Sequence, residues 1–201
     1  MGDNVVLVGF MGAGKSSVGR LLARRLGRCF VETDDMITAR EGRSIPEIFA
    51  ERGEAHFRAL EEEALRLLAL KSGDVIATGG GLPCRDGRPA ALRALGTLVW
   101  LRGDFDTVYA RAQRAGERPM LAGRGREEIE ALYRTREPYY RQADLTVDTT
   151  GINPDQVVSK LLLALHDRLS LSPQGRPSTL SPLRKPSTLS PLGRGQGEGP
   201  Q

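Results

Sequence analysis

A glycine-rich segment near the N-terminus has the residue types and spacing of a phosphate-binding loop. Residues 9–16 are Gly-Phe-Met-Gly-Ala-Gly-Lys-Ser, which fits the pattern G-x-x-x-x-G-K-[ST]. Glycines let backbone N–H groups approach phosphate oxygens, and a helix that begins at the loop adds the positive end of its dipole. The segment therefore predicts that Gly12, Ala13, Gly14, Lys15, Ser16 and Ser17 bind ATP or GTP, because the loop alone does not distinguish a GTPase, an ATPase and a small-molecule kinase.

Two side chains of this segment have the chemistry that phosphoryl transfer needs. Lys15 supplies a cation for the β- and γ-phosphates, and the Ser16 hydroxyl is a ligand for one Mg²⁺ ion that binds with ATP. The surrounding pattern fits a strand, a loop and a helix. Val5–Val8 is a short apolar run typical of a buried strand, and Lys15–Leu26 has apolar residues at helical spacing.

Acidic residues follow a second predicted strand, Phe30–Thr33. Ligands of open α/β sheets bind at the carboxyl ends of the strands. Alternation along the strand predicts that Glu32 and Asp34 share a face, where they could serve a metal ion and an acceptor hydroxyl together. The alternative is that these acids cap a helix, a role for which Asp35 is the best candidate.

The rest of the chain supplies the elements that would position these residues. Further strands are predicted at Val75–Thr78, Thr97–Leu101 and Leu145–Val147. Helices are expected from Ser44 to Arg52, over Glu54–Leu70 and from about Asp104 to Ala115. A further helix is expected to follow the loop that contains Gly116 and Gly125 and to end at Tyr140, and a last one runs from Asn153 to about Leu169. Strands that alternate with helices require crossover connections. The pattern predicts an α/β fold with three layers, in which helices cover both faces of a five-stranded parallel sheet.

Composition divides the chain at about residue 169. Residues 170–201 are rich in Pro, Ser and Gly, contain Pro-Ser-Thr-Leu-Ser-Pro-Leu twice, and carry four basic residues against one acidic residue. Such a segment cannot bury a core, so we predict a disordered tail. The whole chain has a net charge of +4, which leaves +1 for residues 1–169 after the tail's +3. A nearly neutral body indicates no nucleic-acid partner.

The N-terminus has no pattern of a signal peptide or membrane span. The apolar stretch Val5–Phe10 is short and no basic segment precedes it. A membrane helix needs roughly 20 apolar residues, a length that no run in the chain approaches. We therefore expect a cytoplasmic protein without a membrane partner. A monomer is a separate expectation.

Taken together, these motifs resemble the shikimate kinase family over about residues 4–168. The matching segments are Gly9–Ser17, Glu32-Thr-Asp34, Gly42-Arg-Ser-Ile45, Gly53-Glu54, Phe57-Arg58, Glu61-Glu62, Thr78-Gly-Gly-Gly81, Arg118-Pro-Met-Leu121, and Arg136 with Pro138-Tyr139-Tyr140. Most are weak signals alone, but their order and spacing in one chain are specific. The resemblance implies transfer of the ATP γ-phosphoryl group to the 3-hydroxyl of shikimate, in aromatic amino-acid synthesis. It also implies a P-loop kinase fold, with a substrate-binding helical segment at about 33–62 and a lid at about 113–125.

The resemblance assigns roles on the acceptor side. Asp34 would bind the ring hydroxyls and orient or deprotonate the attacking one. Arg58 and Arg136 would bind the shikimate carboxylate, because guanidinium groups suit a planar anion. Gly80 would offer a backbone N–H. Without the resemblance, both arginines would be interpreted as helix-surface cations.

On the nucleotide side, the resemblance places Arg118 of the lid on the ATP phosphates, where it would act in catalysis. Arg111 would stack on adenine, and Asn153 would line the same pocket. The alternatives are a solvated loop cation, a helix-surface cation and a helix cap, respectively. Glu32 stands where the family usually has the aspartate that holds Mg²⁺, so the role is expected to survive with altered geometry. We have no interpretation of Thr38, where the family often has glutamate.

Two other functions compete with this one. A different metabolite kinase of the same shape, such as a gluconate or nucleotide kinase, would share the phosphate loop. A regulatory module that senses nucleotide without catalysis would lack the acceptor residues, yet Asp34, Arg58, Arg118 and Arg136 are all present. The triple glycine, Asp34 and the paired arginines together favour shikimate as the acceptor.

Overall fold

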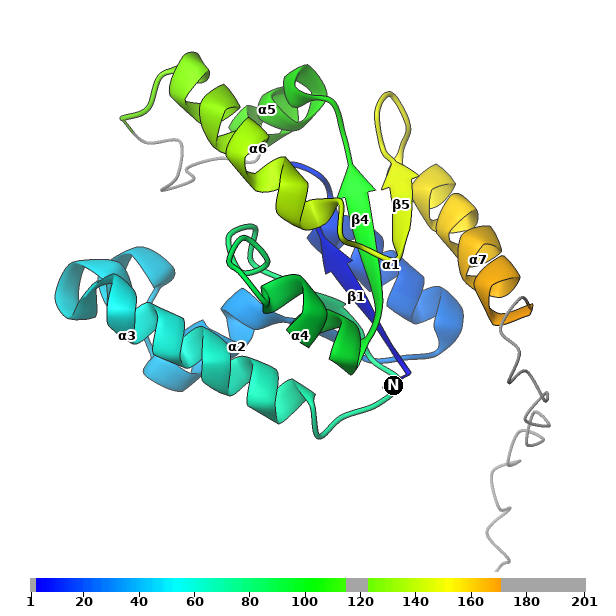
Figure 1. Cartoon of the computed structure of the whole chain (residues 1–201), viewed down its shortest axis with the longest axis horizontal. Coiled ribbons are helices and arrows are strands. Elements are labelled where there is room, and N and C mark those ends of the chain that lie inside the picture. Colours follow the sequence, from blue (N-terminus) through cyan, green and yellow to red (C-terminus); the bar gives the residue numbers. More distant parts are fainter. Residues whose placement is uncertain (1–2, 115–122, 171–201) are drawn as a thin grey trace, which may run out of the picture.

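The computed structural model describes residues 3–114 and 123–170 (Figure 1). Arg118, most of the predicted lid and the predicted tail beyond residue 170 lie outside the described residues. The strands are β1 (Asn4–Val8), β2 (Phe30–Glu32), β3 (Val75–Ala77), β4 (Gly96–Arg102) and β5 (Leu145–Asp148). The helices are α1 (Lys15–Leu26), α2 (Thr33–Glu41), α3 (Ile45–Leu68), α4 (Arg88–Leu95), α5 (Phe105–Arg114), α6 (Arg126–Tyr140) and α7 (Pro154–Ser170).

The five strands form one parallel sheet in the order β2-β3-β1-β4-β5. Its central strand, β1, is buried along its whole length. Val6 pairs with Ile76 on one side and with Leu98 on the other. Helices α1 and α7 cover one face of the sheet and α4 lies on the other (Figure 1). The predicted three-layer α/β fold is confirmed.

Local sequence signals account for where the main helices begin and end. Helix α1 ends at Leu26 and is capped by Gly27, whose φ of 65° puts it in the left-handed region that favours glycine. Ser44 precedes α3, and the Glu47 carboxylate accepts its backbone N–H at 2.8 Å. The two helices expected over 44–70 are confirmed: they meet at Gly53, whose backbone is not helical (φ 76°, ψ 175°), and α3 comprises both.

Two helices differ from expectation. Helix α2 begins at Thr33, immediately after β2, so Asp34 belongs to the first turn of a helix and not to a strand. The alternation argument for Glu32 and Asp34 was therefore wrong, because a helical turn and not a pleat relates the two side chains. Helix α4 was not predicted at all, although Pro89 in its first turn is a helix-start signal.

Within residues 3–114 and 123–170, we find no helix with the combination of length and apolar character that crossing a bilayer demands.

Candidate active site

The phosphate-binding loop connects β1 to α1 and depends on its glycines for shape. Gly12 and Gly14 have φ values of 78° and 90°, in the left-handed region. A Cβ atom on Gly12 would lie 2.1 Å from the Val108 carbonyl oxygen of α5. Glycine at this position thus allows both the turn and the close approach of α5.

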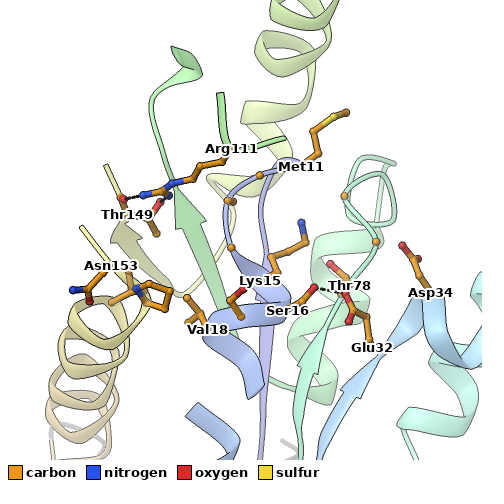
Figure 2. Close-up of a pocket in the computed structure, with 18 of the residues that line it drawn as sticks. Met11, Lys15, Ser16, Val18, Glu32, Asp34, Thr78, Arg111, Thr149 and Asn153 are labelled. Atoms are coloured by element: carbon orange, nitrogen blue, oxygen red, sulfur yellow. Dashed lines mark hydrogen bonds between the residues drawn. The ribbon is translucent and has the colours of Figure 1, made fainter. Parts of the chain in front are cut away.

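A cavity of about 540 Å³ opens along this loop. Its lining includes all six residues of the predicted ATP-binding loop, together with Glu32, Asp34, Thr78, Gly79, Gly80, Arg111, Thr149, Ile152, Asn153, Pro154 and Val157. Figure 2 shows Arg111 and Asp34 on opposite sides of Lys15. The cavity is thus long enough to join the region predicted for adenine to the region predicted for the acceptor.

Ser16 and Glu32 meet at the base of the cavity. The Ser16 hydroxyl donates a hydrogen bond of 2.5 Å to one carboxylate oxygen of Glu32 (Figure 2). The other oxygen of Glu32 lies 3.4 Å from the Arg20 guanidinium. A hydroxyl and a carboxylate are hard oxygen ligands of the kind that Mg²⁺ prefers. The donor set therefore fits a magnesium ion that accompanies ATP, and the longer glutamate side chain reaches Ser16 directly.

Lys15 lies between the loop and Asp34. Its Nζ donates to the carbonyl oxygens of Gly9 and Phe10 at 2.9 and 3.1 Å. Burial raises the pKa of the Asp34 carboxyl, and the charge of Lys15 opposes that rise. The lysine is therefore placed at the junction of the phosphate loop and the acceptor carboxylate.

Asp34 is held in a cramped environment at the other end of the cavity. A Cβ atom on Gly79 would lie 2.5 Å from the Asp34 carboxylate, so glycine lets the loop after β3 pass beside it. Burial is the main cause that raises the pKa of Asp34 to about 6; the charge of Lys15 opposes this rise, and the nearby charges of Glu32 and Glu61 contribute to it. A carboxyl with a pKa close to neutrality is suited to accept a proton from a hydroxyl.

The backbone N–H of Gly80 is the group that is expected to face the acceptor, and hydrogen bonds to the carbonyl oxygen of the same residue hold it in place. Its carbonyl oxygen accepts a hydrogen bond of 2.6 Å from the Tyr140 hydroxyl and lies 3.5 Å from the Cys84 sulfur. Burial raises the pKa of Tyr140 well above its usual range, so the hydroxyl keeps its proton and remains a donor. The sequence motif contained Tyr140, but its role in fixing Gly80 was not predicted.

Arg58 of α3 and Arg136 of α6 come together beside the triple glycine. A Cβ atom on Gly81 would lie 3.3 Å from Arg136 Nη2 and 4.0 Å from Arg58 Nη1. Neither arginine lines the cavity at the phosphate loop, so the two cations border a region beyond Gly80. They have different surroundings: Arg58 pairs with Glu54 and Glu61, whereas Arg136 pairs with no carboxylate among the described residues.

The nucleotide end of the cavity is formed by α5 and the segment before α7. The Arg111 guanidinium donates to the Thr149 and Ile152 carbonyl oxygens at 2.9 and 3.1 Å. The Asn153 side chain accepts the Gln156 N–H at 3.0 Å, which confirms its role as the cap of α7. Both predicted residues line the cavity, and Thr149 and Ile152 are additions that no local motif indicated.

Comparison with known proteins shows the family to which the chain is similar. A family model described as shikimate kinase matches residues 11–166. A shikimate kinase from Thermodesulfovibrio yellowstonii is 41% identical over 168 residues, which cover 83% of this chain and 96% of that protein. One from Moorella thermoacetica is 45% identical over 165 residues, with coverages of 82% and 95%. A solved shikimate kinase from Acinetobacter baumannii, in complex with shikimate, is 34% identical with a TM-score of 0.77, and covers 83% of this chain and 94% of that chain.

Proposed function

Because the chain belongs to the shikimate kinase family, we propose that it transfers the γ-phosphoryl group of ATP to the 3-hydroxyl of shikimate, and that the cavity at the phosphate loop is where it does so. The products are shikimate 3-phosphate and ADP. One arrangement supports this assignment of the site. The phosphate loop, Asp34 and the two arginines, Arg58 and Arg136, lie around the triple glycine at residues 79–81.

Asp34 acts on the acceptor hydroxyl. As the hydroxyl oxygen forms a bond to the γ-phosphorus, its proton passes to the Asp34 carboxylate, and the bond from the γ-phosphorus to the bridging oxygen of ADP breaks. Orientation of the hydroxyl matters as much as proton removal, because this transfer depends mainly on alignment and charge stabilisation. The backbone of Gly79 passes so close to the Asp34 carboxylate that a Cβ atom there would lie 2.5 Å from it, which supports a fixed orientation of this side chain.

The phosphate loop and Lys15 bind the ATP phosphates. Ser16 and Glu32 would hold Mg²⁺, which when bound neutralises charge on the β- and γ-phosphates. Arg118 lies outside the described residues, and its role on the phosphates is proposed from the sequence motif alone. Arg111 and Asn153 form the adenine end, and the hydrogen bonds of the Arg111 guanidinium to the segment before α7 support a fixed wall there. Action as a cytoplasmic monomer stays a prediction.

The acceptor is best identified by comparing three substrates. ADP release in a coupled assay is expected with shikimate and not with gluconate or a nucleoside monophosphate, because the pair of arginines beside Gly81 fits one carboxylate on a compact ring. Gluconate carries the same charge and several hydroxyls, so it is the stringent control. Faster turnover with gluconate than with shikimate would replace this assignment by the competing metabolite kinase.

Removal of the charge of Glu32 is expected to weaken magnesium binding. Glu32→Gln keeps the size of the side chain and its contact with Ser16 but loses the negative charge that attracts the ion. We expect the Mg²⁺ concentration for half-maximal activity to rise by about 10–100-fold, the usual cost of disturbing a metal site. Titration of Mg²⁺ at fixed ATP measures this. An unchanged requirement would mean that another group holds the ion.

A further inference from the structure

A second arginine shares the buried carboxylate that holds Arg58. The Glu61 side chain is only 2% exposed. One of its oxygens accepts hydrogen bonds from Arg58 Nη1 at 2.9 Å and from Arg85 Nη2 at 3.2 Å. Two guanidinium charges therefore face one carboxylate. A buried carboxylate needs such pairing, because an uncompensated charge in this position is costly.

Arg85 reaches Glu61 from the loop that carries the triple glycine. Two backbone hydrogen bonds make this loop compact. The Cys84 N–H donates to the Gly81 carbonyl oxygen and the Arg88 N–H donates to the Arg85 carbonyl oxygen, each with an N···O distance of 3.1 Å. The Arg85–Glu61 pair thus connects the loop after β3 to α3, the helix that bears Arg58. Arg136 borders the same loop, since its Nη2 lies 3.3 Å from where a Cβ atom of Gly81 would be, so both arginines of the proposed carboxylate site lie beside the loop that bears Arg85.

The hydrogen bonding of the Arg85 side chain is incomplete, which is unfavourable for the stability of the fold. Its Nε is buried without a hydrogen-bond partner, the one such side-chain nitrogen or oxygen that we find in the described part of the chain. A buried donor without a partner costs roughly 1–3 kcal/mol. Local violations of this kind concentrate at functional sites. The arginine is held where its charge faces Glu61, although its own hydrogen bonds are incomplete.

The negative charge of Glu61 lies close to the acceptor side of the cavity. Glu61 accepts a hydrogen bond from Arg58 Nη1, and this Nη1 lies 4.0 Å from where a Cβ atom of Gly81 would be, so the carboxylate is close to the triple glycine. The same negative charge would repel the carboxylate of an incoming acid. Arg58 alone cannot cancel it, because Arg58 is also bound by Glu54 through Nε at 3.1 Å and Nη2 at 2.7 Å.

We propose that Arg85 is a positioning residue for acceptor binding: it offsets the charge of Glu61 and so leaves Arg58 oriented toward the acceptor's carboxylate, with its positive charge less fully cancelled by Glu61. This inference rests on the proposed function. It predicts an effect on the affinity for shikimate and not on the chemical step, since Arg85 acts through Glu61 and touches neither the phosphate loop nor Asp34.

The chain offers a matched control for Arg85. Arg88 follows three residues later and pairs with the adjacent glutamate of α3, Glu62. Its side chain is 8% exposed, against 37% for Arg85, so its loss should disturb the packing of this region at least as much. Glu62 does not contact Arg58, however, and Arg88→Ala should therefore leave shikimate binding unchanged.

The test compares shikimate KM, ATP KM, kcat and calorimetric shikimate affinity in wild type, Arg85→Ala and Arg88→Ala. Arg85→Ala is expected to raise shikimate KM by about tenfold, within the range for residues coupled in one ion-pair network, with kcat and ATP KM unchanged. Arg85→Lys should recover part of the loss because it restores the charge. In a Glu61→Gln background, Arg85→Ala should have no further effect. If Arg85→Ala does not fold, Arg85→Gln replaces it.

The outcomes separate this inference from the assignment of function. Wild-type enzyme that neither binds nor phosphorylates shikimate would overturn both. Active wild type with an unchanged KM in Arg85→Ala would overturn the role of Arg85 alone. Two further outcomes would also overturn the role of Arg85, because each would indicate a structural contribution independent of Glu61. One is an equal rise of shikimate KM in Arg85→Ala and Arg88→Ala. The other is an undiminished effect of Arg85→Ala in the Glu61→Gln background.

Discussion

Asp34→Asn is expected to abolish turnover and, at the same time, to make the ligand-free protein more stable above neutral pH. Loss of a general base lowers kcat by about 10²–10⁴-fold, and asparagine cannot accept the proton of the acceptor hydroxyl. Affinity for ADP should change little, because Asp34 lies at the acceptor end of the cavity, across Lys15 from Arg111 (Figure 2). Steady-state assays and calorimetry with ADP measure the two effects separately.

The gain in stability follows from the raised pKa of the Asp34 carboxyl, which burial moves from 3.8 to about 6. The folded protein holds this proton up to about pH 6, whereas the unfolded chain releases it near 3.8. The free energy of unfolding therefore falls as the pH rises through this interval, by about 3 kcal/mol in total. The asparagine of the variant carries no charge, so Asp34→Asn avoids this loss above pH 6 and is close to wild type at about pH 3.

Asp35→Asn provides the matched control for this pair of effects. Asp35 lies in the same helical turn, but its side chain is 69% exposed and 3.7 Å from Arg20. Turnover and stability should both remain near wild type. Urea unfolding at about pH 3 and about pH 8 gives the comparison. Full activity in Asp34→Asn would remove the proposed base, and lower stability than wild type at the higher pH would contradict the cost of burying its charge.

The parts of the site that were predictable depend on local sequence. The phosphate loop needs glycines at fixed spacing because Gly12 and Gly14 adopt left-handed backbone and because α5 packs directly on the loop. The ends of α1 and α7 follow from a left-handed glycine and an asparagine cap, which act within one turn of the chain. Signals of this kind can be recognised without knowledge of the fold.

The parts that were missed depend on contacts between distant segments. The short β2 ends at Glu32 and α2 follows with no intervening loop, so a pleated pattern could not be distinguished from the first turn of a helix. The Glu61 network joins α3 to a loop more than 20 residues away, and no periodicity predicts such a pair. The family motif included Glu61, but the motif alone does not show which arginines it binds.

Arg136→Ala is expected to weaken shikimate binding more cleanly than Arg58→Ala does. Among the described residues no carboxylate pairs with Arg136, so this cation is available to the carboxylate of the acceptor. Truncation of one partner of a well-buried charge pair costs about 2–5 kcal/mol. Shikimate KM should therefore rise by roughly 30- to 4,000-fold, with a much smaller effect on ATP KM. Arg136→Lys should fall between the two, since it keeps the charge and loses the planar fork.

The two arginines should differ in what else their loss disturbs. Arg58→Ala removes one of the two partners of buried Glu61, so it should lower the melting temperature as well as raise shikimate KM. Arg136→Ala breaks no such pair and should leave the melting temperature close to that of wild type. Arg134→Ala, on an exposed face of the same helix α6, controls for loss of positive charge at a distance. An unchanged shikimate KM in Arg136→Ala would refute direct binding of the carboxylate by this arginine. An equal rise of KM in Arg134→Ala would instead indicate a long-range effect of net charge. Two arginines on one helix should differ in their effect on KM only if one of them contacts the carboxylate.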